Sequence, residues 1–285
     1  MKVVLKYLIT FVLPGITFGQ VVEKKTTWFK DNVSIRKTFD GSKNENKPAT
    51  FSLYENHKSD NDYINADVAI KIKEWELFED SGTVLTLFPV AEYHRSTNEN
   101  DKKDKLSAGL NTEFYFGSKW NLKPYLLSNV AFKRNFMEGI NEIKYVGQIS
   151  LFGTKPGQPG YKWRFDNDGA DYRGTYYPYL GYEYNEIPDL VTEGTTEIMS
   201  AIFFRVFLEH WFSPKSVQVT IDGIYRNLIS TNAIKNDLPL INIALNYYPG
   251  NQSHISIGLD YKNGYDPDSK FTHVEITSLN LKFNF

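Results

Sequence analysis

The last seven residues of the chain, 279–285, alternate strictly between large apolar and polar side chains and end on a phenylalanine. Successive side chains of a β-strand point to opposite faces, so this period of two predicts a strand with one apolar and one polar face. The same alternation recurs far upstream, where Ile64 and Ala66 alternate with Asn65 and Asp67. The fold is therefore expected to consist of long, two-faced strands.

The alternation, followed along the whole chain, predicts twelve strands after a polar stretch at residues 21–47. The expected strands span residues 49–56, 63–78, 83–95, 106–117, 122–134, 143–153, 172–184, 198–212, 217–228, 238–248, 253–262 and 271–285. On residues 83–95, Leu85 and Leu87 belong to the apolar face, and Thr86 and Glu92 belong to the polar one. Such faces suit a sheet that separates an apolar environment from a polar one.

The N-terminus has the plan of a secretion signal. Lys2 and Lys6 precede an apolar run at residues 7–16, and small residues follow at 17–19. We interpret residues 1–19 as a signal peptide, because the run is shorter than the ~20 residues that a membrane-spanning helix needs. The remaining chain divides into a polar periplasmic segment at residues 20–47 and a strand domain at residues 48–285. The chain has no cysteine, so no disulfide supports the fold.

A secretion signal, repeated alternation and a terminal phenylalanine together resemble the Gram-negative outer-membrane β-barrel proteins, whose final strand typically ends in an aromatic residue. The resemblance implies an all-β, transmembrane, antiparallel up-and-down β-barrel of about 12 strands, surrounded by outer-membrane lipid. A soluble β-sandwich would also show alternation. The length of the strands and the aromatic residues near their ends, among the 19 tyrosines and 20 phenylalanines, favour the barrel.

The connections between the expected strands also fit a barrel. One side receives short turns, at residues 79–82, 117–120, 213–216 and 250–252, and the other receives longer polar loops, around residues 98–105, 135–142, 186–197, 229–237 and 266–268. Outer-membrane barrels have short periplasmic turns and longer extracellular loops. Residues 154–171 break this rule, because they are long but fall on the short-turn side. Either they contain a missed strand or they form an elaborated loop.

The expected lumen is polar and carries both signs of charge. Its candidate lining residues are Glu92, His94, Arg205, Glu209, Asp222 and Arg226. These charges could select small solutes in a narrow channel, or they could fill the interior as a structural plug. We therefore expect a channel-like, small-solute porin or a structural barrel. A barrel that binds partners through its outer loops is a further alternative.

Other classes of function find little support. The net charge of −2 and the absence of a basic patch with interleaved aromatics argue against nucleic-acid binding. No motif for nucleotides, zinc or dinucleotide cofactors is present, so no cofactor or metal is expected. Residues 166–171 resemble part of a calcium loop, but Arg164 and Thr175 stand where ligands are needed. The polar residues 21–47 could be a tail or a plug, and a loosely held tail is the expectation.

One enzyme class needs separate weighing. The outer-membrane phospholipase uses a His-x-Ser pair, and this chain has His94-Arg95-Ser96 with Asn98 nearby, and a second pair at His57-Lys58-Ser59. On the first strand His94 and Ser96 share the polar face with Glu92, which directs them into the lumen, whereas a lipid hydrolase needs its nucleophile toward lipid. We therefore expect no catalytic residues and no enzymatic activity, with a phospholipase-like hydrolase as the alternative.

Overall fold

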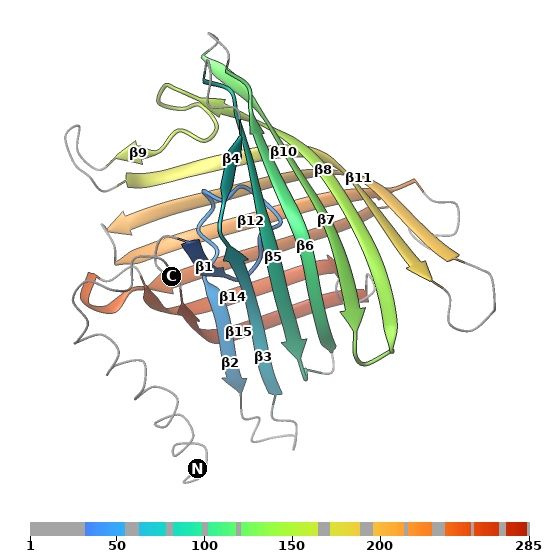
Figure 1. Ribbon diagram of the computed structural model, residues 1–285. Helices are drawn as coiled ribbons and strands as arrows, with labels where there is room; N and C mark the ends of the chain where they lie inside the picture. Colours follow the sequence, from blue (N-terminus) through green and yellow to red (C-terminus); the bar gives the residue numbers. More distant parts are fainter. Residues whose placement is uncertain are drawn as a thin grey trace.

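The computed structural model describes residues 32–54, 63–77, 82–98, 102–117, 121–164, 172–188, 196–213, 216–229, 237–251, 254–267 and 272–283 (Figure 1). The expected signal peptide, the His57-Lys58-Ser59 pair and the calcium-like residues 166–171 lie outside these residues. The described residues include no helix that is long and apolar enough to cross a membrane.

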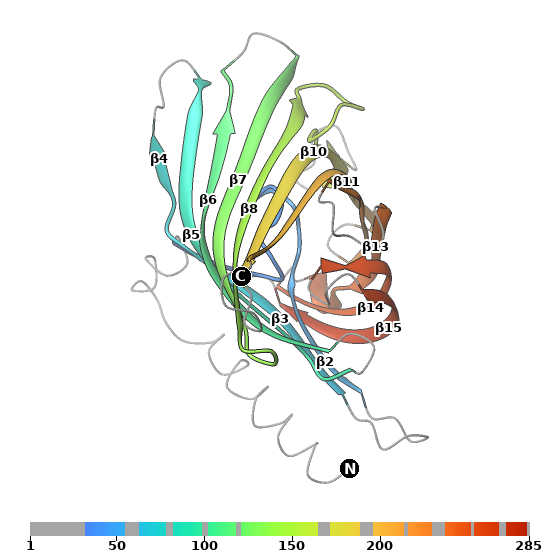
Figure 2. The ribbon, with the colours of Figure 1, turned by 90° about the vertical axis from the view of Figure 1, so that its right-hand side faces the viewer.

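Twelve antiparallel strands close into a barrel (Figures 1 and 2). They are β2 (Ala49–Tyr54), β3 (Tyr63–Ile72), β5 (Val84–Ser96), β6 (Lys103–Tyr115), β7 (Leu122–Asn135), β8 (Ile140–Gly153), β10 (Tyr172–Pro188), β11 (Thr196–Ser213), β12 (Val217–Leu228), β13 (Asp237–Tyr247), β14 (Ile255–Asp266) and β15 (Thr272–Phe283). Each strand pairs with the next in chain order, and β15 pairs with β2 from Leu281↔Phe51 to Phe283↔Ala49, which closes the ring. The expected all-β, up-and-down, twelve-stranded barrel is confirmed.

Three short strands accompany the barrel. Strand β4 (Trp75–Leu77) resumes the course of β3 on β5 after a break at Lys73, whose φ of 53° lies outside the strand region. Strand β9 (Trp163–Arg164) pairs with β10. It lies within the connection 154–171. The sequence left open whether this connection contains a missed strand or an elaborated loop, and its described part contains both. The remaining short strand is β1 (Val33–Arg36), which pairs with β3.

The two faces of the barrel wall differ as the sequence predicts. On β15, Leu279 is 65% exposed on the outer face and Asn280 is 3% exposed on the inner face. On β5, Thr86 is buried inside, and the pairing with β6 runs without a register shift from Val84↔Tyr115 to Ser96↔Lys103. Because a single inserted residue would reverse the faces, this continuous register keeps every even-numbered side chain of β5 on the inner face.

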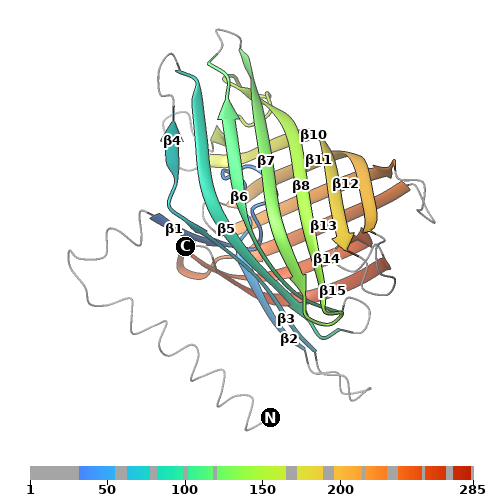
Figure 3. The ribbon, with the colours of Figure 1, turned by 45° about the vertical axis from the view of Figure 1, so that its right-hand side comes forward.

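The segment before β2 is not a tail over the part that the structure describes. Strands β1 and β2 both pair with β3, from Val33↔Ile72 to Arg36↔Ala69 and then from Thr50↔Asp67 onward. Between them, residues 37–48 leave the sheet and enter the barrel interior (Figure 3). We call residues 37–48 the lumenal loop. The expectation of a loosely held periplasmic tail was therefore wrong for residues 33–47, because residues 33–36 pair with β3 and the loop that follows is bonded to the inner wall.

The outer face gives a test of which surface meets lipid. We predict that Leu279→Arg lowers the yield of folded barrel in lipid vesicles much more than Ser278→Arg. Leu279 is on the exposed apolar face near the middle of the strand, where arginine costs about 2–4 kcal/mol in a bilayer, and Ser278 lines the interior cavity. Folding yield is read from the fraction that resists unfolding in unheated gels. Equal losses for the two variants would contradict the assignment of the faces.

Candidate functional site

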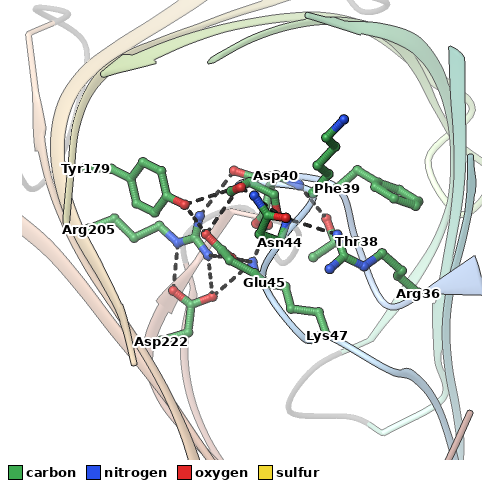
Figure 4. Close-up of polar contacts among 12 residues, drawn as sticks. Arg36, Thr38, Phe39, Asp40, Asn44, Glu45, Lys47, Tyr179, Arg205 and Asp222 are labelled. Carbon is green, nitrogen blue, oxygen red and sulfur yellow. Dashed lines mark hydrogen bonds and ion pairs between the residues drawn. The ribbon is translucent and has the colours of Figure 1, made fainter. Parts of the chain in front are cut away.

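The strongest attachment of the lumenal loop is a charged cluster around Arg205 of β11 (Figure 4). Its Nη2 donates to Glu45 of the loop at 2.7 Å, and its Nε and Nη2 donate to the two oxygens of Asp222 on β12 at 2.7 and 2.9 Å. Arg205 is 3% exposed and Glu45 is fully buried. One guanidinium therefore joins the loop to two adjacent wall strands with three charge-assisted hydrogen bonds.

Lys47 at the end of the loop adds a second cation to this cluster. Its Nζ lies 2.6 Å from Asp40, 3.0 Å from Glu45 and 3.2 Å from Asp222. Burial and the neighbouring guanidinium of Arg205 act to lower the pKa of the Lys47 ammonium. The three carboxylates outweigh both effects, so the pKa of Lys47 lies above its ordinary value and the side chain stays charged.

The backbone of the loop is hydrogen-bonded to the wall on the opposite side. The Phe39 amide donates to Glu92 of β5 at 2.7 Å, and the Lys43 amide donates to Glu113 of β6 at 2.8 Å. Loop carbonyls also accept from the wall. The side chain of Asn111 donates to the Phe39 carbonyl at 2.9 Å, and that of Gln148 on β8 donates to the Asp40 carbonyl at 2.9 Å. Buried backbone groups need partners, and these wall side chains supply them.

Two further features require this particular loop sequence. Phe39 packs into an apolar cluster with Ala69, Phe88 and Val90, and its ring meets Phe88 edge-on at 6.2 Å. Gly41 is enclosed so tightly that an added Cβ would lie 2.3 Å from Glu45 and 2.5 Å from Arg205. Any larger residue at position 41 would therefore displace the charged cluster.

Large aromatic side chains fill the interior near the ends of the strands that carry the short turns. Tyr125, Tyr177, Tyr179 and Phe207 form one buried cluster, and Tyr115 and Phe152 pack against it. We call these six residues the aromatic layer. The loop lies against it, since Ser42 accepts from or donates to the Tyr125 hydroxyl at 3.4 Å and its amide donates to the Tyr179 hydroxyl at 3.2 Å. The layer and the loop therefore fill this part of the lumen together.

A smaller buried network of hydrogen bonds fills another part of the interior, where β11 and β12 face the residue that follows β13. Glu209 of β11 accepts from the Trp211 indole at 2.8 Å and from the Gln218 amide at 2.7 Å. The Tyr248 hydroxyl donates to Gln218 at 2.9 Å, and the Tyr248 and Trp211 rings lie 5.0 Å apart. All four side chains are at most 5% exposed.

A polar cavity of about 270 Å³ remains between the loop and the rest of the wall. Its lining includes Asp40 and Lys47 of the loop, and it extends to Lys133, Lys144 and Arg226, which lie toward the long-connection ends of β7, β8 and β12. The described part of the interior is therefore divided: packed side chains fill the short-turn end, and a polar cavity occupies the region above them. We call this cavity the chamber.

All six residues predicted to line the lumen lie on the inner face. Glu92, His94, Arg205, Asp222 and Arg226 line the chamber, whereas Glu209 is fully buried in the network with Trp211 and Gln218. The structure brings Arg205 and Asp222 into one cluster. His94 contacts Asp67 at 2.9 Å and Glu92 at 3.4 Å, away from that cluster.

The loop residues Phe39, Glu45 and Lys47 and the inward tyrosines Tyr125, Tyr177 and Tyr179 were not predicted from the sequence. Tyr177 and Tyr179 could have been found from strand parity, because they alternate with Tyr176, Leu180 and Tyr182, which share the opposite face of the same strand. Among the described residues there is no cluster of His, Asp or Glu side chains that could hold a metal ion.

Among known proteins, the chain is similar to solved structures of β-barrel domains. The chain matches no protein-family model and no curated protein. Similar solved structures include the transport unit of the autotransporter AIDA-I from Escherichia coli, with 11% identity, coverage of 93% of this chain and 94% of that chain, and a TM-score of 0.39. The beta domain of the Bordetella autotransporter Brka has 8% identity, coverage of 89% and 96%, and a TM-score of 0.36.

The Arg205 cluster predicts a specific loss of stability. Arg205→Gln should lower the free energy of unfolding by about 3–5 kcal/mol, because it leaves the carboxylates of Glu45 and Asp222 buried with one fewer cation. Urea unfolding of the barrel in detergent measures the loss. Adding Glu45→Gln to the variant should recover part of it, since one buried charge then disappears. A double variant as unstable as the single one would contradict the pairing.

Proposed function

We propose that this protein is a Gram-negative outer-membrane β-barrel whose lumen is closed by its own lumenal loop, and that it serves as a structural or solute-binding barrel and not as an open porin. The observation that carries the proposal is the position of residues 37–48, which contact the inner wall from β5 to β12. An open porin needs a continuous aqueous path through the lumen.

The barrel architecture supports the proposed location. Its outer face carries large apolar side chains at more than 40% exposure, among them Leu180, Phe204, Leu259 and Leu279. Such a surface is costly in water and favourable in lipid, and a closed sheet leaves no backbone edge unpaired. The chain would cross the inner membrane by means of the proposed signal peptide at residues 1–19.

The location is tested by fractionation. We expect the protein in the outer-membrane fraction, where it should migrate faster in unheated than in heated detergent gels, because a folded barrel resists unfolding. The closed ring of strands supplies the reason. Recovery of the mature protein as a soluble monomer would overturn the proposed location.

The closed lumen is tested by conductance in planar bilayers. The wild-type barrel should give no steady single-channel steps, whereas a variant in which two glycines replace residues 38–46 should conduct. The Lys37 amide donates to the Lys47 carbonyl at 2.7 Å, so the two ends of the loop are close enough for this short linker. The aromatic layer remains in the variant, so its conductance is expected to be small.

Steady conductance of the wild-type barrel at the level of an open porin would contradict the closed lumen. Gly41→Leu provides a matched variant that keeps the chain length. Because any side chain at this position meets Glu45 and Arg205, the variant should displace the loop and produce intermittent conductance.

We also propose that the barrel is not a lipid hydrolase. His94 and Ser96 are both on the inner face of β5, and Ser96 is 3% exposed. His94 lies between Asp67 and Glu92, so its ring nitrogens are engaged by carboxylates. A serine that attacks an acyl ester from the membrane would need to face outward.

The corresponding prediction is that His94→Ala and Ser96→Ala leave ester hydrolysis by the purified barrel unchanged. The assay uses mixed phospholipid micelles with calcium, and the inward direction of both side chains gives the reason. A measurable rate that either substitution abolishes would favour the phospholipase-like alternative.

A further inference from the structure

We propose that the chamber binds a small anionic solute, one that carries a phosphate, sulfate or carboxylate group, on a basic part of its wall. Lys133 of β7, Lys144 of β8 and Arg226 of β12 line the chamber there, and Lys105 of β6 lies on the inner face next to Glu142. We call these four cations the basic arc. The inference rests on the proposed function and deepens it, because it names the class of solute that the closed lumen would hold.

The basic arc contains more cations than carboxylates. Its two carboxylates are Glu142, at 3.8 Å from Lys105, and Glu183, at 3.4 Å from Lys144 and 3.3 Å from Arg226. Lys133 is the cross-strand neighbour of Glu142. Four cations therefore face two carboxylates, and all three of the ion-pair distances exceed the 2.7 Å found between Arg205 and Glu45. The arc has a net charge of +2 and loose internal contacts.

Arg226 gives an independent indication of a missing partner. The residue is 6% exposed, and its Nε donates to Glu183 at 3.3 Å. Its Nη1 is buried and has no hydrogen-bond partner among the described residues. A buried, charged donor without a partner is costly, and an anion in the chamber could accept from a guanidinium in this position.

Five other carboxylates on the described chamber wall have cationic partners elsewhere: Asp40 with Lys47 at 2.6 Å, Asp67 with Lys103 at 3.6 Å, Asp222 with Arg205 at 2.7 Å, Asp260 with Lys282 at 2.5 Å, and Asp266 with Lys262. The remaining two, Glu92 and Glu113, accept the Phe39 and Lys43 amides of the lumenal loop. The basic arc is thus a local excess of positive charge on one side of the chamber. Because the surroundings are partly desolvated, this local excess attracts anions more strongly than it would in water.

The geometry of the wall explains how the arc is assembled. Glu183 of β10 and Arg226 of β12 are separated by β11, on which Ala201 is the cross-strand partner of Glu183. The small side chain of Ala201 leaves space for the arginine to reach across β11. Lys144 then approaches Glu183 from β8, the strand on its other side. One carboxylate therefore orients two cations toward the same region of the chamber.

The test is calorimetric titration of the intact barrel in a zwitterionic detergent with sodium pyrophosphate and, separately, with inorganic phosphate, at constant ionic strength. We expect saturable binding by the wild-type protein. Arg226→Gln and Lys144→Gln should each weaken it about tenfold, the effect of losing one hydrogen bond to a charged group. Lys262→Gln is the matched control, because Lys262 also lines the chamber but is paired with Asp266; it should leave the affinity unchanged.

Absence of saturable binding by folded wild-type barrel overturns the proposal. So does equal weakening by Lys262→Gln, which would indicate a general effect of charge. Arg226→Lys keeps the charge and should fold if Arg226→Gln does not, and it should bind more weakly than wild type because it loses the planar donors. Conductance is measured on the same samples. A conducting wild-type barrel would refute the closed lumen without affecting the calorimetric result.

Discussion

The seam between the first and last barrel strands is the constraint on which the interior depends. Strand β2 has six residues and, among the residues that the structure describes, pairs with β15 at three positions, Ala49 to Phe51. This short contact turns an open twelve-stranded sheet into an enclosed volume. Once the volume is enclosed, an inward polar side chain is costly unless it finds a partner inside it. The polar inner face, the charged clusters and the aromatic layer all follow from that requirement.

The interior meets this requirement differently at different heights. Near the short turns, tyrosines and phenylalanines fill the interior. The hydroxyls of Tyr125 and Tyr179 form hydrogen bonds with the lumenal loop. At the level of the loop, charges of opposite sign pair closely around Arg205. Toward the long connections of β8, β10 and β12, the side chains surround the chamber without filling it, and their ion pairs are longer. The gradient from packed aromatic side chains to loosely paired charges is consistent with a floor that stabilises the barrel and a chamber that remains available to solutes.

Much of the wall could be predicted from the sequence, because alternation fixes both the existence of a strand and the direction of its side chains. Glu92 and His94 were assigned to the inside from the parity of a single strand, and the structure places them there. The loop could not be predicted in the same way. Glu45 and Arg205 are 160 positions apart, and no local pattern encodes their contact. A polar segment has the same kind of amino-acid composition whether water or a polar lumen surrounds it.

The lumenal loop connects two strands, β1 and β2, that lie one after the other along the same side of β3. Both ends are tied, because β1 and β2 pair with the same neighbour and the Lys37 amide bonds to the Lys47 carbonyl. A plug formed by a free terminus can be threaded into a finished barrel or pulled out of it. Here the loop can enter or leave the lumen only while the four residues of β1 are separated from β3. We therefore expect residues 37–48 to be on the concave side of the sheet before β1 pairs with β3.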